Sequence, residues 1–303
     1  MTEMIGQIIG NCRIEAPLGV GGMGQVYRAR HVQLGRLQAV KILHADLAHN
    51  PDFQAQFRRE AAVIARLRHP HITRIFDYGA WNGREYLVME LLPDGSLKEI
   101  IRPQPDCRQR RALVAGLDLL RQAAEGVAHA HACGIVHRDI KPGNLLLMPA
   151  RHTRTVSGYL LKVSDFGLAH LVTEQAQAVG QAGSSTGTPA YMAPEQFQGQ
   201  AVDARSDLYA LGMILYELVT GRPPFGVRSL GEAAFNHRYT HPVAPRQVCP
   251  DLPAELDDII MRCLMKHPDE RSLSAAALAD ALRTIVGTLT APEAAGRDAI
   301  GRR

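Results

Sequence analysis

The chain falls into two parts by its pattern of apolar and polar residues. In the first part, short runs with partial alternation predict β-strands, and these runs are RIEAPLG, QVYRARHV, RLQAVKIL and YLVMELL. One segment there has a helical period instead, because Phe53, Phe57, Ile64 and Leu67 fall on one face of a helix. We therefore expect a small strand-rich unit that contains one main helix.

The second part has mostly helical periodicity. The helices that it predicts cover residues 111–134, 207–221, 253–266 and 272–287. Gly134 suits the end of the first helix, and Ser272 or Ser274 suits the N-cap of the last. The pattern predicts an α+β protein with two lobes, residues 1–92 and 93–287, followed by a flexible tail over 288–303.

Composition narrows the function classes without naming one. Of the 303 residues, 46% are hydrophobic and 21% are charged, which is ordinary for a globular protein. A net charge of +4, spread along the chain, argues against nucleic acid as a partner. The five cysteines form no C-x-x-C pair, so the spacing suggests neither a zinc site nor a disulfide framework.

The sequence also argues against a membrane segment and a secretory signal. The longest apolar stretch, residues 207–221, is short and is interrupted by Asp207 and Glu217. The N-terminus lacks a basic region ahead of an apolar core. We expect a cytoplasmic chain, which is either complete and soluble or an excerpt of a longer protein.

A glycine-rich stretch, GVGGMGQV, contains the spacing G-x-G-x-x-G at Gly19, Gly21 and Gly24. An NTPase P-loop is excluded because Gln25, not Lys-Ser/Thr, follows the last glycine. A dinucleotide-binding loop would open a helix, whereas a strand pattern follows here. A hairpin between two strands remains, which could be either a phosphate-binding lid or a purely structural turn.

Two charged residues lie in apolar patterns near this hairpin. Lys41 stands inside the apolar strand AVKIL, where a lysine usually lies at a sheet edge with its amine in water. Glu60 shares the apolar face of the predicted helix, and burying a lone carboxylate is costly. An ion pair between Lys41 and Glu60 would satisfy both residues and could present the lysine to phosphate oxygens.

The stretch HRDIKPGN is far more specific. Asp139 could accept a hydroxyl proton, Lys141 could balance charge on a moving phosphoryl group, and Asn144 could offer its carbonyl oxygen to Mg²⁺. Asp165, at the end of a predicted strand in the sequence DFG, is a natural second metal ligand. Phosphoryl transfer requires mainly positioning and charge neutralisation, and this set offers both.

Taken together, these motifs resemble those of Hanks-type (eukaryotic-like) Ser/Thr protein kinases, in particular the bacterial PknB-like group. The order and spacing agree from about residue 10 to residue 287. The matching residues are Gly19, Gly21, Gly24, Val26, Ala39–Lys41, Glu60, His137–Asp139, Asn144, Asp165–Gly167, Ala193–Glu195, Asp207 and Arg271. The resemblance implies the two-lobed protein kinase fold, with an antiparallel sheet in the N-lobe and a mostly helical C-lobe.

The resemblance also implies roles in ATP and metal binding. Lys41, held by Glu60, would contact the α- and β-phosphates, while Asp139 and Lys141 would act at the acceptor hydroxyl and the transferring phosphoryl group. Asn144 and Asp165 would hold Mg²⁺, with Mn²⁺ as an alternative. The remaining ATP-binding residues would be Gly19, Val20, Gly21, Gly22, Gly24, Val26, Ala39 and Leu146, with Met89 as gatekeeper and Glu90 and Leu92 as hinge residues.

Other implied roles are structural or regulatory. Arg271 would pair with Glu195, and Asp207 would brace the catalytic loop. Arg138 would receive a phosphate placed on the activation segment, where the candidates are Ser184, Ser185 and Thr186; Thr188 lies in the part that faces the acceptor. The expected substrates are Ser and Thr residues of proteins, including a second copy of this chain in a transient homodimer.

Three other functions compete with protein phosphorylation. A pseudokinase scaffold usually lacks one of the catalytic residues, whereas Lys41, Asp139 and Asp165 are all present. A small-molecule phosphotransferase typically lacks an APE segment, which is present here in GTPAYMAPE. A nucleotide-binding module without chemistry would not require the full set of acid, metal-binding and lysine residues.

Overall fold

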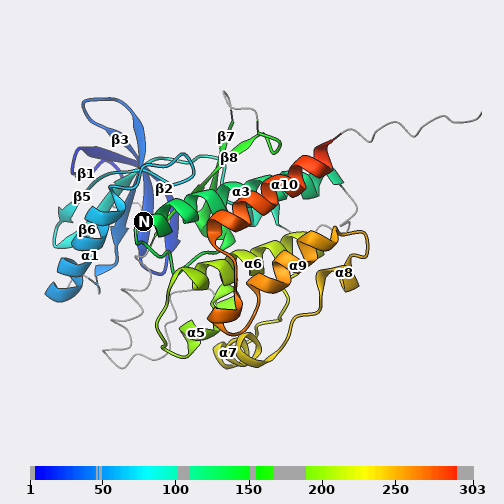
Figure 1. The fold of residues 1–303 in the computed structure, drawn as a ribbon. Helices are drawn as coiled ribbons and strands as arrows, with labels where there is room; N and C mark the ends of the chain where they lie inside the picture. The colour runs from blue at the N-terminus through cyan, green and yellow to red at the C-terminus, as the bar shows by residue number, and fades with distance from the viewer. Residues whose placement is uncertain are drawn as a thin grey trace, which may run out of the picture.

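The computed structural model describes residues 4–45, 47, 50–101, 110–150, 155–166 and 189–291. In Figure 1 the N-terminal strands gather on one side of the molecule and the helices of the C-terminal part on the other. Within these residues, no helix combines the length and the apolar character needed to cross a membrane. The strand-rich and helix-rich parts expected from the sequence pattern are both present.

The N-terminal sheet has six antiparallel strands in the order β1-β2-β3-β4-β6-β5. They are β1 (Ile8–Ile9), β2 (Cys12–Gly21), β3 (Gly24–His31), β4 (Leu37–Leu43), β5 (Ile75–Trp81) and β6 (Arg84–Met89). β1 pairs with β2 only at Cys12 and Arg13. At Pro17, β2 is therefore an edge of the sheet, since among the described strands only β3 pairs with it there. An edge position suits a proline, which cannot donate a hydrogen bond to a neighbouring strand.

β4 explains how a lysine becomes buried in an apolar strand. Its side chains alternate between two faces. Val40 and Ile42 belong to an apolar cluster on one face of the sheet, whereas Ala39 and Leu43 belong to the main core on the other. Lys41 lies between Ala39 and Leu43 in this alternation, and its side chain is 7% exposed. The sheet therefore directs the ammonium group of Lys41 toward the interior face.

The predicted helix of the first part is α1 (Pro51–Ile64). The side chain of Asn50 caps it by accepting hydrogen bonds from the amides of Asp52 and Phe53. Phe53, Phe57 and Ile64 are buried, as the helical period predicts. The apolar face of α1 thus closes one side of the sheet and positions the rest of the helix near the junction of the two lobes.

The second part contains the predicted helices and several short elements. The elements are α2 (Leu97–Ile100), α3 (Arg110–Ala132), η3 (Pro142–Asn144), β7 (Leu145–Pro149), β8 (Tyr159–Val163), η4 (Pro189–Tyr191), α5 (Pro194–Phe197), α6 (Ala204–Thr220), α7 (Leu230–Tyr239), α8 (Pro245–Val248), α9 (Ala254–Cys263), η5 (Pro268–Glu270) and α10 (Ala275–Thr290). Ser274, not Ser272, caps α10. This helix extends to Thr290, beyond the expected start of a flexible tail at residue 288.

Helix α6 forms the centre of the helical part. It is apolar on almost every side and is buried along most of its length, because it packs between α3 and α9. α10 lies along α3, as Figure 1 shows, and the hairpin of β7 and β8 packs on α3 as well. This packing places the loop before β7 and the residues after β8 at the junction with the N-terminal sheet.

Candidate active site

The loop between α3 and β7 holds the three polar residues singled out in HRDIKPGN. The Lys141 ammonium lies 2.7 Å from Oδ2 of Asp139. Asn144 Nδ2 donates to the backbone oxygen of Asp139 at 2.8 Å and to its Oδ2 at 3.1 Å. The carboxylate of Asp139 is thereby fixed by two side chains of its own loop, which is the preorganisation that a general base requires.

Asp207 anchors this loop from the first turn of α6. Its buried carboxylate accepts hydrogen bonds from the amides of His137 and Arg138, each at 2.8 Å. A third bond at 2.8 Å joins it to Nε2 of His131. These contacts are the ones that the bracing role expected of Asp207 requires.

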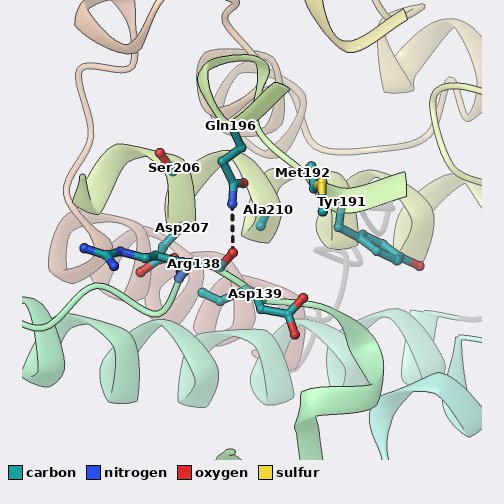
Figure 2. A pocket seen from close by; sticks show the side chains of 9 residues that line it. Arg138, Asp139, Tyr191, Met192, Gln196, Ser206, Asp207 and Ala210 are labelled. Atoms are coloured by element: carbon teal, nitrogen blue, oxygen red, sulfur yellow. Dashed lines mark hydrogen bonds between the residues drawn. The ribbon is translucent and has the colours of Figure 1, made fainter. Parts of the chain in front are cut away.

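Arg138 has a left-handed backbone conformation, with φ of 68°. This conformation is unfavourable for a residue with a side chain, so neighbouring groups must support it. Asp207 supports the amide of Arg138, and Gln196 Nε2 donates to its carbonyl at 2.8 Å, as Figure 2 shows. The other amide atom of Gln196, Oε1, accepts from the backbone N–H of Ala193 at 2.9 Å. Gln196 therefore connects the catalytic loop to the start of α5.

Asp165 and Lys41 form an ion pair across the junction of the lobes. Lys41 Nζ lies 2.8 Å from Oδ1 of Asp165. Burial alone would raise the pKa of Asp165, but the positive charge and hydrogen bond of Lys41 outweigh it and hold the pKa below its usual range. The following residue, Phe166, is buried, with its ring centroid 4.6 Å from that of His137. The carboxylate of Asp165 is therefore ionised and directed at Lys41.

The expected ion pair between Lys41 and Glu60 is not formed in this structure. Lys41 pairs with Asp165, as described above. Glu60 is half-buried and lines a hollow of about 230 Å³ together with Val63, Gly134 and Arg138. The physical reason is that α1 directs Glu60 toward the end of α3 and the catalytic loop, so the nearer carboxylate of Asp165 takes the lysine.

The glycine-rich stretch is the hairpin that joins β2 and β3. Gly21 pairs with Gly24 at its end, and Gly19 pairs with Val26. A Cβ atom on Gly24 would lie 2.1 Å from the carbonyl oxygen of Ile42, so only glycine fits against β4 at this position. Nε2 of His44 lies 3.0 Å from the Gly21 carbonyl oxygen, a contact that the sequence did not suggest. Val20 and Gly22, which are also expected to contact ATP, lie at this exposed end of the hairpin.

The residues expected to contact adenine belong to adjoining strands. Ala39 is the register partner of Met89, and Lys41 that of Val26. Leu146 lies in β7, where it pairs with Lys162 of β8. The N–H of Glu90 donates to the Arg74 carbonyl at 2.9 Å. The backbone carbonyl of Glu90 is therefore the group of this residue that is left for a ligand. Leu92 follows it as a half-buried residue of the connection between the lobes.

The expected Glu195–Arg271 pair is present and almost completely buried. The two guanidinium nitrogens of Arg271 contact the two oxygens of Glu195 at 2.7 and 2.9 Å, and the side chains are 0% and 2% exposed. Ser206 Oγ, on α6, donates to Glu195 Oε1 at 2.6 Å. Burial raises the pKa of Glu195, but the bonds from Arg271 and Ser206 reverse this, and the net pKa lies below its usual range.

Two contacts of the segment around η4 and α5 did not follow from the sequence. The first is the pair of bonds that Gln196 makes, described above. The second is a hydrogen bond that the Tyr191 hydroxyl donates to Glu217 of α6 at 2.6 Å. Burial raises the pKa of both side chains. Part of the signal for Gln196 was available, because a Gln three residues after an N-cap, with Pro at the first helical position, is half of a capping-box pattern, although Ala193 has no side-chain acceptor to complete it. No local pattern pointed to the Tyr191–Glu217 contact.

Several expectations concern residues outside the part of the chain that the structure describes. These residues are Gly167, Ser184, Ser185, Thr186 and Thr188. The roles assigned to them from the sequence stay predictions.

Comparisons with known proteins agree with this geometry. A family model described as "Protein kinase domain" matches residues 12–282. Serine/threonine-protein kinase PknB of Mycolicibacterium smegmatis is 39% identical over 282 residues, which cover 91% of this chain and 43% of that protein. A probable serine/threonine-protein kinase of Streptomyces coelicolor is 42% identical over 262 residues, which cover 85% of this chain and 37% of the relative.

The fold agrees with solved structures as well. The crystal structure of the Mycobacterium tuberculosis PknI kinase domain superimposes with a TM-score of 0.70 at 28% identity, covering 93% of this chain and 98% of that domain. The chain spans 43% and 37% of the lengths of the two curated relatives given above. The family model matches residues 12–282, and the polar loop, the ion pairs and the glycine hairpin agree with it. The chain therefore belongs to the protein kinase domain family.

Proposed function

We propose that this chain transfers the γ-phosphoryl group of ATP to Ser and Thr hydroxyls of proteins. The observation that carries the proposal is the carboxylate of Asp139, which Lys141 and Asn144 fix, together with the ion pair of Lys41 and Asp165. The names of the relatives, which are serine/threonine-protein kinases, support the choice of acceptor. The presence of the complete set argues against the pseudokinase alternative.

In the proposed reaction, the acceptor oxygen forms a bond to the γ-phosphorus while the bond to the β–γ bridging oxygen breaks and ADP leaves. Asp139 takes the proton of the hydroxyl, and Lys141 stabilises charge on the transferring group. Lys41 would contact the α- and β-phosphates. Glu60 is proposed to hold Lys41 there, which would leave Asp165 free to hold a metal ion.

The residues present fit a magnesium ion. Asn144 uses its amide nitrogen to bind Asp139, which leaves its side-chain carbonyl oxygen for a cation. Asp165 offers a carboxylate whose lowered pKa keeps it charged. Both are the hard oxygen ligands that Mg²⁺ prefers, and the ion would neutralise charge on the phosphates of ATP.

Labelled ATP tests the proposal directly. Wild-type protein, incubated with Mg²⁺, ATP labelled at the γ-position and a pool of Ser- and Thr-containing peptides, should label the peptides at Ser and Thr. Asp139→Ala should reduce the rate by roughly 10²–10⁴-fold, as expected for loss of a general base. Transfer that is equally fast in Asp139→Ala, or labelling confined to small molecules, would show that the proposal is wrong.

Autophosphorylation of the activation segment is a finer part of the proposal. Ser184, Ser185 and Thr186 are the candidate positions, and the phosphate would pair with Arg138. Mass spectrometry of the chain after incubation with ATP measures it, and mixing the wild type with Asp139→Ala distinguishes reaction between copies from reaction within one. A fully active enzyme that remains unmodified would contradict this part and leave peptide phosphorylation unaffected.

A further inference from the structure

A hollow of about 390 Å³ lies behind the connection between the lobes, away from the catalytic loop. We call it the basic groove and define it by Arg36, Arg68, Arg74, Phe76, Glu90 and Lys162. Its lining comes from several elements: the turn before β4, the segment after α1, the start of β5, the connection after β6, and β8. The groove therefore spans both the N-terminal sheet and the hairpin that follows the catalytic loop.

The basic groove carries an excess of positive charge. Glu90 is the acidic residue among its lining, and its carboxylate is already paired with Lys162 at 3.0 Å. Within the described part of the chain, no ion pair involves Arg36, Arg68 or Arg74. Three guanidinium groups thus gather around one hollow without an ion-pair partner among the described residues, and an anion placed there would relieve their repulsion.

Phe76 gives two of these arginines a defined position. The guanidinium carbon of Arg36 lies 4.1 Å from the centroid of the Phe76 ring, and that of Arg74 lies 5.6 Å from it. Stacking on an aromatic ring holds a guanidinium group while leaving its N–H edge available for hydrogen bonds. These N–H edges match the oxygens of a phosphate group, which can accept two bonds from one guanidinium.

We propose that the basic groove binds a phosphorylated Ser or Thr in an extended segment of a partner protein. A phosphate carries nearly two negative charges, so it suits three uncompensated arginines better than a single carboxylate does. The volume exceeds that of a lone phosphate and is sufficient for neighbouring residues of the segment. Nucleic acid fits less well, because its row of phosphates would need a longer basic stripe than this confined group.

The proposed site goes beyond the catalytic proposal, because binding at the groove needs no phosphoryl transfer. A phosphorylated partner held there would leave the catalytic cleft free. The chain could then act on a second Ser or Thr of a protein that already carries one phosphate.

Fluorescence polarisation on the full chain tests the proposal, with the Asp139→Asn variant to prevent turnover. The probe is a degenerate fluorescent peptide pool with a fixed central phosphothreonine or phosphoserine, and the comparison is the same pool without phosphate. We expect the phosphorylated pool to bind more tightly, with affinity that falls as salt rises. Added to the Asp139→Asn background, Arg36→Ala together with Arg74→Ala should weaken its binding by about tenfold or more.

Arg246→Ala is the matched control, because Arg246 is exposed and lies in α8, remote from the groove. It should bind like the parent Asp139→Asn protein, and thermal melting should show that all variants are folded. Equal binding of both pools, or binding unaffected by the groove variants, would overturn the proposal. A third outcome would also overturn it: inorganic phosphate displaces neither pool, and a DNA oligonucleotide binds tightly in a way that depends on the groove arginines.

Discussion

The bond from Gln196 to the Arg138 carbonyl makes a strong kinetic prediction. Gln196→Glu retains the shape of the side chain and the oxygen that accepts from Ala193, but it places a carboxylate oxygen against the Arg138 carbonyl, where a donor stands now. The substitution therefore removes one support of a left-handed residue directly before Asp139. We expect the catalytic loop to leave its working position for part of the time.

The magnitude follows from the hydrogen bond that is lost. A neutral hydrogen bond such as this 2.8 Å contact contributes about 0.5–1.5 kcal/mol net. The left-handed conformation that it supports costs roughly 1–2 kcal/mol for a residue with a side chain. Losing the bond alone should therefore lower kcat by about two- to thirteenfold, and repulsion between the Glu carboxylate and the Arg138 carbonyl makes this a lower limit. The KM for ATP should stay unchanged, because Gln196 contacts no residue expected to bind the nucleotide.

Steady-state kinetics with a Ser/Thr peptide measures both parameters, and hydrogen exchange at the amides of residues 137–140 reports the position of the loop. Gln198→Ala is the matched control, since Gln198 is exposed in the same segment. It should behave like the wild type in both measurements. If Gln196→Glu retained wild-type kcat and wild-type exchange, the positioning argument would be refuted. A loss of kcat that merely follows the unfolded fraction would refute it too.

Three further predictions concern stability. Glu195→Gln should lower the free energy of unfolding by about 3–5 kcal/mol in chemical denaturation, because it leaves the guanidinium of Arg271 buried without a countercharge; a loss below about 1 kcal/mol would contradict this. Burial lowers the pKa of His237 from 6.5 to about 4. As the pH falls, the His237 imidazole therefore binds its proton at a higher pH in the unfolded chain than in the folded one. The unfolding free energy should fall by about 1.4 kcal/mol per pH unit from pH 6.5 down toward 4. His237→Gln should show a shallower slope, and an unchanged slope would show that other groups cause it. Gly24→Ala should cost about 1–3 kcal/mol in thermal unfolding, because the added Cβ meets the Ile42 carbonyl; a variant as stable as the wild type would show that β4 yields easily.

Patterns that are local in sequence could be predicted well. The long helices follow from apolar periodicity, and the catalytic loop follows from the spacing of Asp139, Lys141 and Asn144. β5 was missed because its residues are mostly half-buried or exposed and do not alternate clearly. The four-residue helices α2 and α5 are too short to show a period.

Contacts between distant residues were harder to predict. The pair of Glu195 and Arg271 spans 76 positions, and only the family resemblance suggested it. The partner of Lys41 was predicted as Glu60, whereas the structure pairs it with Asp165. Sequence identifies carboxylates that could approach a lysine, but the choice between them depends on where α1 lies relative to the sheet.

Helix α6 anchors both the loop that carries Asp139 and the segment that contains Tyr191 and Glu195. Asp207 attaches the catalytic loop to it, while Ser206 binds Glu195 and Glu217 binds Tyr191. The proposed base and the segment proposed to face the acceptor are thus both attached to one buried helix, whereas Lys41 is carried by the sheet. We expect the sheet to tilt for nucleotide exchange without changing the distance from the base to the acceptor surface. Affinity for nucleotide and choice of acceptor can then change independently of each other.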